Sequence, residues 1–140
     1  MAWPLRMKQA LEFVLAKFPQ TLSIDEISAS LGIHRRTFEK EFHQTFGLSY
    51  VPFLRLLFMY EAWHLKHYTQ QSSSEVAAFL GYHAETHLAR DCQKLLQVSP
   101  KQLRELSEKD FRALMKRAFD SKGSVGLSHC DGASENSAAI

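Results

Sequence analysis

The side chains best suited to hydrogen-bonding chemistry are Arg36, Glu39, Lys40 and His43, which follow one another at spacings of three and four. On a helix these spacings place all four side chains on one face, with Arg35 beside them. Such a face offers both donors and acceptors and can contact a polyanionic partner. The alternative interpretation is a solvated helix face on which Glu39 pairs with His43.

Histidine pairs at helical spacing are a second candidate for chemistry. The pairs are His64-x-x-His67 and His83-x-x-x-His87, with Cys92 near the second pair. Neither pair has a dependable third ligand or belongs to a His-Glu-x-x-His motif, so we expect no metal site. The sequence also contains no glycine-rich phosphate loop, nucleophile elbow or pair of catalytic carboxylates. We therefore expect neither an enzyme nor a cofactor-binding protein.

The composition is that of an ordinary globular protein. The 140 residues are 45% hydrophobic and 23% charged, with only four prolines and six glycines, which favours a mostly helical domain with a real core. The net charge of +2 permits a polyanionic partner without requiring one. No stretch approaches about 18 uncharged apolar residues and no signal-peptide pattern opens the sequence, so we predict a cytoplasmic protein without a membrane partner.

Capping signals divide the first third of the sequence into three helices. Apolar residues at spacings of three and four predict a helix over 4–18. Ser23 and Glu26 form a capping box that begins a second helix, and Gly32 ends that helix at low conformational cost. A third helix is predicted over about 35–46, and it carries the charged face described above.

The rest of the sequence follows the same plan after a longer helix. Ser49 can cap that helix, and Ser72 and Glu75 form a second capping box before a short helix that ends at Gly81. Further helices are predicted over about 84–96, 100–106 and 107–119, and the small, polar residues 120–140 are predicted to be a disordered tail.

The two capped starts belong to an internal repeat, because Ile27-Ser28-x-x-x-Gly32 recurs as Val76-Ala77-x-x-x-Gly81. In each copy a small residue allows close helix packing and a glycine permits a tight turn, which is the signature of a helix-turn-helix. A protruding helix with arginine on its open face suits the major groove of DNA. Helical hairpins with glycine turns also occur in bundles and scaffolds, but two copies in one short chain favour DNA binding.

Over about residues 5–105 the sequence resembles the AraC/XylS family of bacterial transcription regulators. The matching segments are ISASLGIHRRTFEKEFHQTFG, PFLRLLFMYEAWHL and VAAFLGYHAETHLARDCQKLLQVSPKQLR. The resemblance implies an all-α fold of two homeodomain-like helix-turn-helix subdomains joined by a linker helix. The boundaries that we predict are 1–48 for the first subdomain, 49–69 for the linker helix, 70–106 for the second subdomain, 107–119 for an extra helix and 120–140 for the tail. Full-length members often carry an N-terminal sensing or dimerising domain, so the chain is either a short standalone member or a fragment.

Departures from the family pattern concentrate in the second subdomain. Leu88 and Cys92 stand where the family has phenylalanine, Gln97 where it has glycine, and Leu103 where it has tyrosine. The second subdomain should therefore bury less apolar area, and we expect it to be either less stable or repacked against the extra helix. In the first subdomain, His34 stands where a serine or threonine normally caps the recognition helix.

The resemblance also implies roles for individual side chains. The implied base-reading residues are Arg36, Glu39, Lys40 and His43 in the first subdomain and Glu85, Thr86 and Arg90 in the second. The expected phosphate contacts are Arg35, Arg55 and the helix N-termini near His34 and Ser74. On the second recognition helix two acids, Glu85 and Asp91, balance Arg90 and Lys94, so we expect it to contribute less than the first.

These features predict a sequence-specific DNA-binding transcription regulator whose recognition helices enter successive major-groove segments. We expect it to bind double-stranded DNA as a monomer, because each chain carries two reading units, and to act by recruiting or repositioning RNA polymerase. The alternative is a non-catalytic interaction module that keeps the fold but binds another regulator or RNA polymerase rather than a specific DNA site. The low net charge and the altered second core favour this alternative, whereas the duplicated motif favours DNA recognition.

Overall fold

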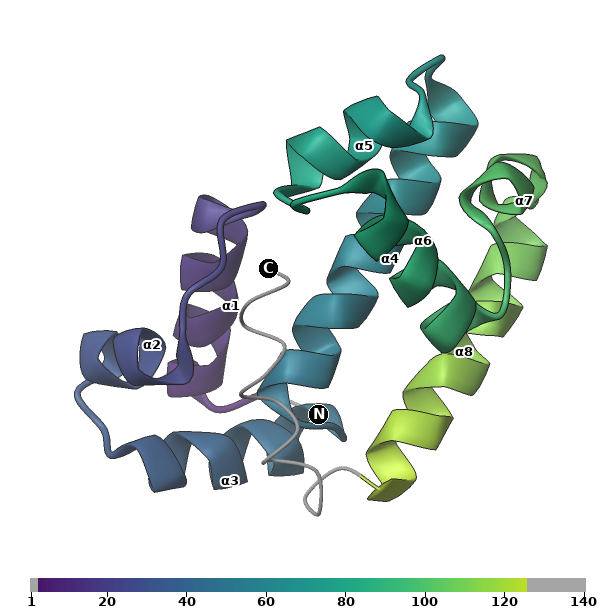
Figure 1. Ribbon diagram of the computed structural model, residues 1–140. Helices are drawn as coiled ribbons and strands as arrows, with labels where there is room; N and C mark the ends of the chain where they lie inside the picture. Colours follow the sequence, from purple (N-terminus) through teal and green to yellow (C-terminus); the bar gives the residue numbers. More distant parts are fainter. Residues whose placement is uncertain (1–2, 126–140) are drawn as a thin grey trace.

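The computed structural model describes residues 3–125, and within that range all regular elements are helices. In chain order they are α1 (Leu5–Lys17), α2 (Ile24–Leu31), α3 (Arg35–Phe46), α4 (Tyr50–Tyr68), α5 (Ser73–Leu80), α6 (Glu85–Asp91), the π-helical η1 (Cys92–Leu96), α7 (Pro100–Glu105) and α8 (Glu108–Val125). The prediction of an all-α fold is confirmed. The long α4 runs through the molecule, with α1–α3 gathered toward one end and α5–α7 toward the other (Figure 1). None of the described helices is long and apolar enough to cross a membrane.

The first unit, α1–α3, forms where the predicted local signals lie. Ser23 Oγ accepts a hydrogen bond from Glu26 N at 3.1 Å, and the Glu26 carboxylate accepts one from Ser23 N at 2.8 Å. Gly32 then ends α2 with a φ of 72°, a left-handed conformation that glycine adopts without strain. Beyond this corner, the fully buried Phe38 and Phe42 of α3 each pack edge-on against Tyr50 of α4, with ring centroids 5.4 Å apart.

The second unit, α5–α7, repeats this corner but departs from the prediction further along. Ser72 and Glu75 form the second capping box, and Gly81 ends α5 with a φ of 86°. The helix predicted over 84–96 is not a continuous α-helix, because it changes at Cys92 into the π-helical η1. A π turn is wider than an α turn, so adjacent side chains diverge less, and Leu95 and Leu96 are both buried in the core.

The extra helix α8 packs against this second unit and completes its core. Phe111 of α8 is buried and stacks face to face on Trp63 of α4, with centroids 4.6 Å apart and planes 8° apart. The helix contacts both α4 and η1. Of the two outcomes expected for the altered second core, the structure therefore shows repacking against α8. The helix also extends past its predicted end at residue 119, so the predicted tail is wrong for residues 120–125, and the rest of that prediction lies outside the described residues.

Arg104, at the end of α7, fastens the second unit to the end of the linker helix. Its guanidinium donates hydrogen bonds to the carbonyl oxygens of Lys66 at 2.7 Å, Thr69 at 2.8 Å and Gln71. These carbonyls lie at and just beyond the C-terminus of α4, where helical partners are lacking. The Arg104 side chain thus supplies hydrogen-bond donors to three carbonyl oxygens where α4 passes into the loop before α5.

Candidate nucleic-acid interface

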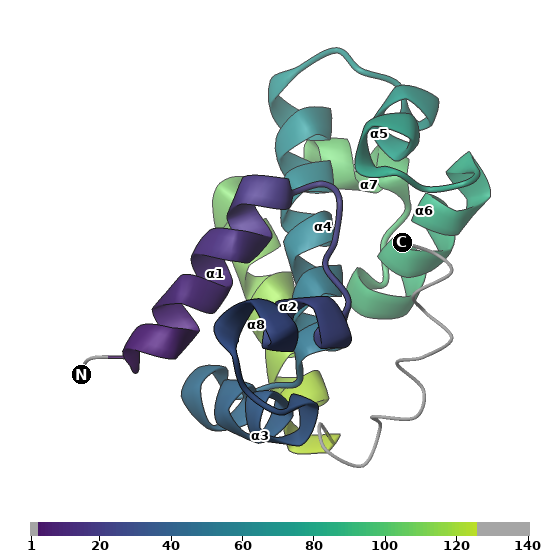
Figure 2. The ribbon, with the colours of Figure 1, turned by 90° about the vertical axis from the view of Figure 1, so that its left-hand side faces the viewer.

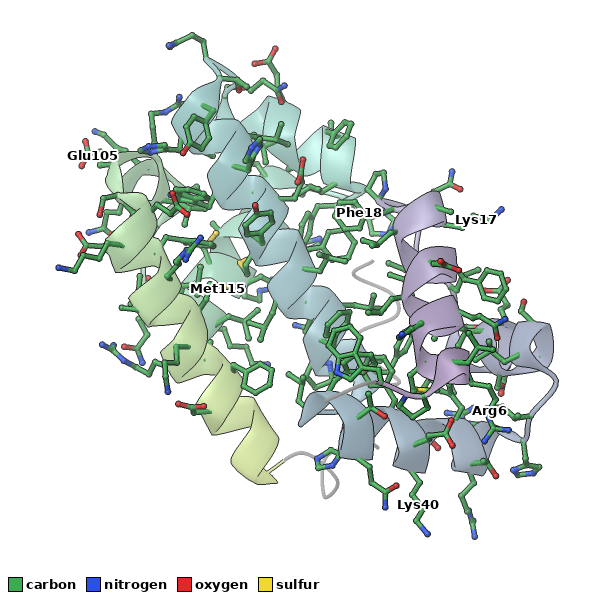
Figure 3. The ribbon with its side chains drawn as sticks, turned by 180° about the vertical axis from the view of Figure 1, so that it is seen from behind. Arg6, Lys17, Phe18, Lys40, Glu105 and Met115 are labelled. Atoms are coloured by element: carbon green, nitrogen blue, oxygen red, sulfur yellow. The ribbon has the colours of Figure 1, made fainter. Side chains whose placement is uncertain are left out.

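The exposed face of α3 presents two cations that have no carboxylate partner among the described residues. Arg36 and Lys40 are both exposed, and neither takes part in an ion pair that the described residues form. Figure 3 shows Lys40 extending from α3 away from the rest of the molecule. By contrast, Glu41 on the same helix is held by Arg6 of α1 through two hydrogen bonds, of 2.8 and 3.2 Å. The helix therefore offers solvent a face with uncompensated positive charge.

His34 caps α3 at the position where the family pattern has a serine or threonine. Its Nδ1 accepts a hydrogen bond from the backbone N–H of Arg36 at 3.1 Å. Because Nδ1 is the acceptor, the neutral ring carries its proton on Nε2, and the side chain is exposed. One imidazole can thus stabilise the start of α3 and still donate a hydrogen bond outward.

The other predicted residues of the first reading helix are partly engaged within the protein. Arg35 lies 3.2 Å from Asp25 Oδ1 and 3.8 Å from Glu39 Oε1, so Glu39 pairs with Arg35 and the alternative Glu39–His43 pair is not formed. Exposed ion pairs of this kind contribute little to stability, so Arg35 can readily exchange its carboxylate partner for another anion. His43 is half-buried, and its Nε2 is enclosed with no hydrogen-bond partner among residues 3–125. His43 is thus less available to a ligand than Arg36 or Lys40.

The second unit presents a similar but smaller set of exposed side chains. Glu85, Thr86 and Arg90 of α6 are exposed, and Arg90 makes no ion pair with any described residue. Ser74 is exposed in the first turn of α5, where the capping box uses the amide of Glu75. The first two amides of α5 therefore remain for water or an anion, as at the start of any helix. In a second view, α3 lies toward the lower end of the molecule and α6 to the right of α4 (Figure 2).

Arg55 contradicts its predicted role as a phosphate contact. It is only 7% exposed, and its guanidinium lies 3.2 Å from Asp91 Oδ1, also 7% exposed, on α6. The hydroxyl of Tyr82 donates to the other carboxylate oxygen of Asp91 at 2.8 Å. Burial, with Asp91 nearby, raises the pKa of Tyr82 and raises the pKa of Cys92 to about 12, so both groups stay protonated at neutral pH. Arg55 therefore joins the linker helix to the second reading helix from inside the protein.

This buried cluster of Arg55, Asp91 and Tyr82 also corrects the predicted charge of α6 and η1. With Asp91 turned inward, Glu85 is the remaining acid beside Arg90 and Lys94, and the outer face is positive rather than balanced. The sequence contained a signal that we missed. Arg55 lies four residues before Met59, which is fully buried on the same face of α4.

The histidine pairs do not gather into a metal-binding group in residues 3–125, where no three His, Cys, Asp or Glu side chains lie close enough to hold an ion. His67 stacks on Trp63 with centroids 5.0 Å apart, and its Nδ1 lies 3.0 Å from the carbonyl oxygen of Arg104. Because a carbonyl oxygen only accepts, Nδ1 of His67 donates this hydrogen bond, which holds the ring against Trp63 and the end of α7. The first pair is thus part of an aromatic cluster.

Comparisons with known proteins agree with this geometry. A family model described as a helix-turn-helix domain, of the AraC type, matches residues 27–106. The C-terminal domain of AraT, a response regulator from Geobacillus stearothermophilus, superimposes with a TM-score of 0.68 at 22% identity, covering 77% of this chain and 93% of that one. An AraC-type transcriptional regulator from Chromobacterium violaceum gives a TM-score of 0.66 at 22% identity, covering 71% and 89%.

A third similar structure is the DNA-binding domain of AdpA, a global transcriptional factor, in complex with a target DNA. It gives a TM-score of 0.65 at 21% identity and covers 71% of this chain and 90% of its own. No curated protein matches the sequence. The structural similarities establish the fold, and the family match covers more than half of the sequence. The chain belongs to the AraC-type family of helix-turn-helix DNA-binding domains, the family of bacterial transcription regulators that its sequence resembles.

Proposed function

We propose that this DNA-binding regulator domain recognises a specific duplex site as a monomer, with α3 and α6 in two successive segments of the major groove. Bound there, it regulates transcription by recruiting or repositioning RNA polymerase. The segments of one groove that face the same side of a duplex are about 34–36 Å apart. A chain with two reading helices on one linker helix can span that distance without a second copy.

The observation that carries the proposal is the pattern of unpaired cations. Arg36 and Lys40 on α3, and Arg90 on α6, are exposed at helical positions suited to reading bases, and none has a carboxylate partner among the described residues. Arg35, next to Arg36 on the same helix, is by contrast paired with Asp25. An unpaired arginine loses no internal contact when it binds guanine through two hydrogen bonds.

We propose that α3 supplies most of the discrimination between bases. Arg36 and Lys40 can each contact guanine, a pair worth about 1–3 kcal/mol of discrimination, and Glu39 can accept a hydrogen bond from cytosine. On α6, Arg90 is the strongest candidate for a base contact, with Thr86 and Glu85 beside it. The corrected charge of α6 supports a reading role for the second unit and weakens the case for a pure protein-interaction module.

Phosphate contacts are proposed for His34, Arg35 and the first turn of α5 at Ser74. The imidazole of His34 is exposed and uses Nδ1 for the cap, and the first amides of α5 have no helical partner. Each phosphate that is neutralised changes the slope of log affinity against log salt by about −0.9. Arg55 is left out of this set because it is buried in its pair with Asp91.

The test is selection of binding sites from random duplexes on the purified protein, followed by affinity measurements at one stated salt concentration. We expect R36A combined with K40A to lower affinity for the selected site by about 30-fold or more, equivalent to at least about 2 kcal/mol. The matched control is K109A, which removes an exposed charge from α8 and should change affinity by less than about twofold.

Two results would contradict the proposal. One is the absence of salt-dependent duplex binding at low ionic strength. The other is binding without sequence enrichment, which would favour the interaction module, and in that case R36A with K40A should leave binding of the protein partner intact.

A further inference from the structure

The helix α8 lies outside the segment that matches the family model, which ends at residue 106. It contacts η1, the segment that continues directly from the second reading helix α6. Figure 1 shows α8 passing beside the end of that segment. Ala118 of α8 is buried in the same apolar cluster as Leu95 and Leu96 of η1. Side chains of α8 next to Ala118 therefore have a defined position relative to the second reading helix.

A small pocket of about 200 Å³ opens where η1 and α8 meet. The buried and half-buried residues of its lining are apolar and include Leu95 and Leu114. The exposed residues of its lining are polar and include Lys94, Gln97 and Arg117. No carboxylate belongs to this lining within residues 3–125. The pocket therefore has an apolar base and two cations at its edge, an arrangement that favours an anion.

The two cations of this pocket are not neutralised from within the described part of the chain. Neither Lys94 nor Arg117 forms an ion pair with a described residue. Asp120, close to Arg117 in sequence, lies 3.1 Å from Lys116 and is paired there. Asp91, close to Lys94 in sequence, is buried in its ion pair with the linker helix. The pocket thus keeps its positive charge for an external partner.

The size and the donors of the pocket limit which anion it can hold. Pockets for drug-sized ligands enclose about 300–1,000 Å³, so one of about 200 Å³ suits a compact group rather than a whole nucleotide. Lysine and arginine only donate hydrogen bonds, and the guanidinium of Arg117 can donate two in parallel to a phosphate group. The side-chain amide of Gln97 can add a neutral donor. A phosphate group therefore fits both the volume and the donor set.

The place of the pocket on the second unit indicates where this phosphate group comes from. Lys94 follows Arg90 by four residues, so it lies about one turn further along the same face of the α6–η1 segment. In homeodomains, the C-terminal end of the reading helix contacts the sugar–phosphate backbone. With Arg90 in the major groove, Lys94 would therefore lie at the backbone, with Arg117 of α8 beside it.

We propose that Lys94, Gln97 and Arg117 form a phosphate-binding pocket that holds one backbone phosphate of DNA beside the box that α6 reads. This rests on the proposed function, because the pocket reaches the backbone only when α6 lies in the groove. A phosphate contact carries no sequence information, so the pocket raises affinity and fixes the register of the second unit without reading a base. It gives α8, which lies beyond the matched segment, a part in DNA binding.

The first experiment measures affinity for the selected duplex over a range of salt concentrations. We expect K94A combined with R117A to lower affinity about tenfold and to reduce the steepness of the salt dependence by about 0.9, the value for one phosphate. Discrimination between bases should stay unchanged in both boxes, which a displaced α6 would not allow. The control, K109A combined with R112A, removes two exposed charges of α8 that do not line the pocket and should change affinity by less than about twofold. Thermal unfolding verifies that each variant is folded.

The second experiment replaces single backbone phosphates by uncharged methylphosphonates around the box in which R90A loses discrimination. We expect one replacement to weaken binding of the wild type about tenfold, but that of K94A with R117A by about threefold or less, because the contact is already lost. Equal losses for both proteins at every phosphate would overturn the pocket and leave specific DNA recognition standing.

Two further outcomes separate the pocket from the proposed function and from a free anion. Duplex binding without a preferred sequence would contradict the proposed function, and salt slopes measured on that duplex would still decide whether the pocket holds a phosphate. Inorganic phosphate is added in a parallel NMR titration of the full chain. Saturable shifts at Lys94 and Arg117, with no methylphosphonate replacement distinguishing the two proteins, would assign the pocket to a free anion and overturn the contact with DNA.

Discussion

At equivalent places in the two units, Phe42 and Cys92 are both fully buried, yet their surroundings differ. Phe42 lies among four aromatic rings, those of Phe38, Phe46, Tyr50 and Phe53, all within or directly beside the first unit. Cys92 belongs to a cluster built from α4, α5, α6, η1, α7 and α8. The smaller side chain leaves room that distant parts of the chain fill.

The difference extends to polar contacts. The first unit is capped by local hydrogen bonds, the Tyr50 hydroxyl of α4 donates to the Leu22 carbonyl oxygen at 2.8 Å, and its ion pairs, such as Arg35–Asp25, are exposed. The second unit depends on a buried ion pair to α4 and on Arg104, which binds carbonyls more than thirty positions earlier in the sequence. The first reading helix is thus joined to α4 by aromatic packing, and the second by a buried ion pair.

The difference between the two units is tested most strongly by removing one carboxylate from each and comparing the losses of stability. D91A leaves the buried Arg55 without a counter-ion and Tyr82 without its acceptor, so we expect the free energy of unfolding to fall by about 3–5 kcal/mol. D25A removes a pair with the same 3.2 Å separation at the surface and should cost less than about 1 kcal/mol. Urea unfolding at neutral pH measures both, and equal losses would show that the burial of the pair is unimportant.

A second comparison uses two arginines of the C-terminal part. R104A removes the three hydrogen bonds that fasten α7 to the end of α4, and we expect a loss of about 2–3 kcal/mol in the free energy of unfolding. R112A removes an exposed guanidinium from α8, paired with Glu108 at 2.6 Å, and should cost less than about 1 kcal/mol. Chemical denaturation of both variants in one buffer measures these losses. A loss of stability for R112A as large as that for R104A would contradict the role of Arg104 in holding α7 to the end of α4.

The smallest expected effect concerns the end of η1, where the second unit lacks the glycine of the family pattern. Gln97 adopts a φ of 61°, a left-handed conformation that costs a side-chain-bearing residue about 1 kcal/mol. Q97G should therefore raise the free energy of unfolding by about 1 kcal/mol. The control Q93G places glycine inside the helical segment and should lower it by a similar amount. Destabilisation by Q97G would mean that the glutamine side chain makes an important contact.

The parts of the fold that the sequence predicted are those with local causes. Ser23 with Glu26, Ser72 with Glu75, and the two corner glycines act over a few residues, so their effects could be derived without knowing the tertiary structure. The phosphate role of Arg55 was wrong because its burial depends on Asp91, which is remote in sequence and meets it only after α6 packs on α4. The π turn at Cys92 and the reach of α8 depend likewise on packing between distant helices.

In the candidate site, too, the sequence predicted what depends on local structure and not what depends on contacts with other elements. Arg36, Lys40 and Arg90 lie on exposed helix faces as their spacing predicted, since helical periodicity alone determines which side they occupy. Whether an exposed cation is paired depends on side chains from other elements, and this distinguishes Arg36 from Arg35. Periodicity therefore predicted the face, and the structure shows which residues of that face have no internal partner among those described.

The central claim is that each unit reads its own part of one DNA site, and single arginine variants test it most directly. Affinities of R36A and R90A should be measured for the selected duplex and for duplexes with a base substitution in one box or the other. We predict that R36A loses discrimination in one box only, that R90A does so in the other box only, and that the loss is larger for R36A. If neither variant changes discrimination in either box, while both remain folded, the account of two reading units is contradicted.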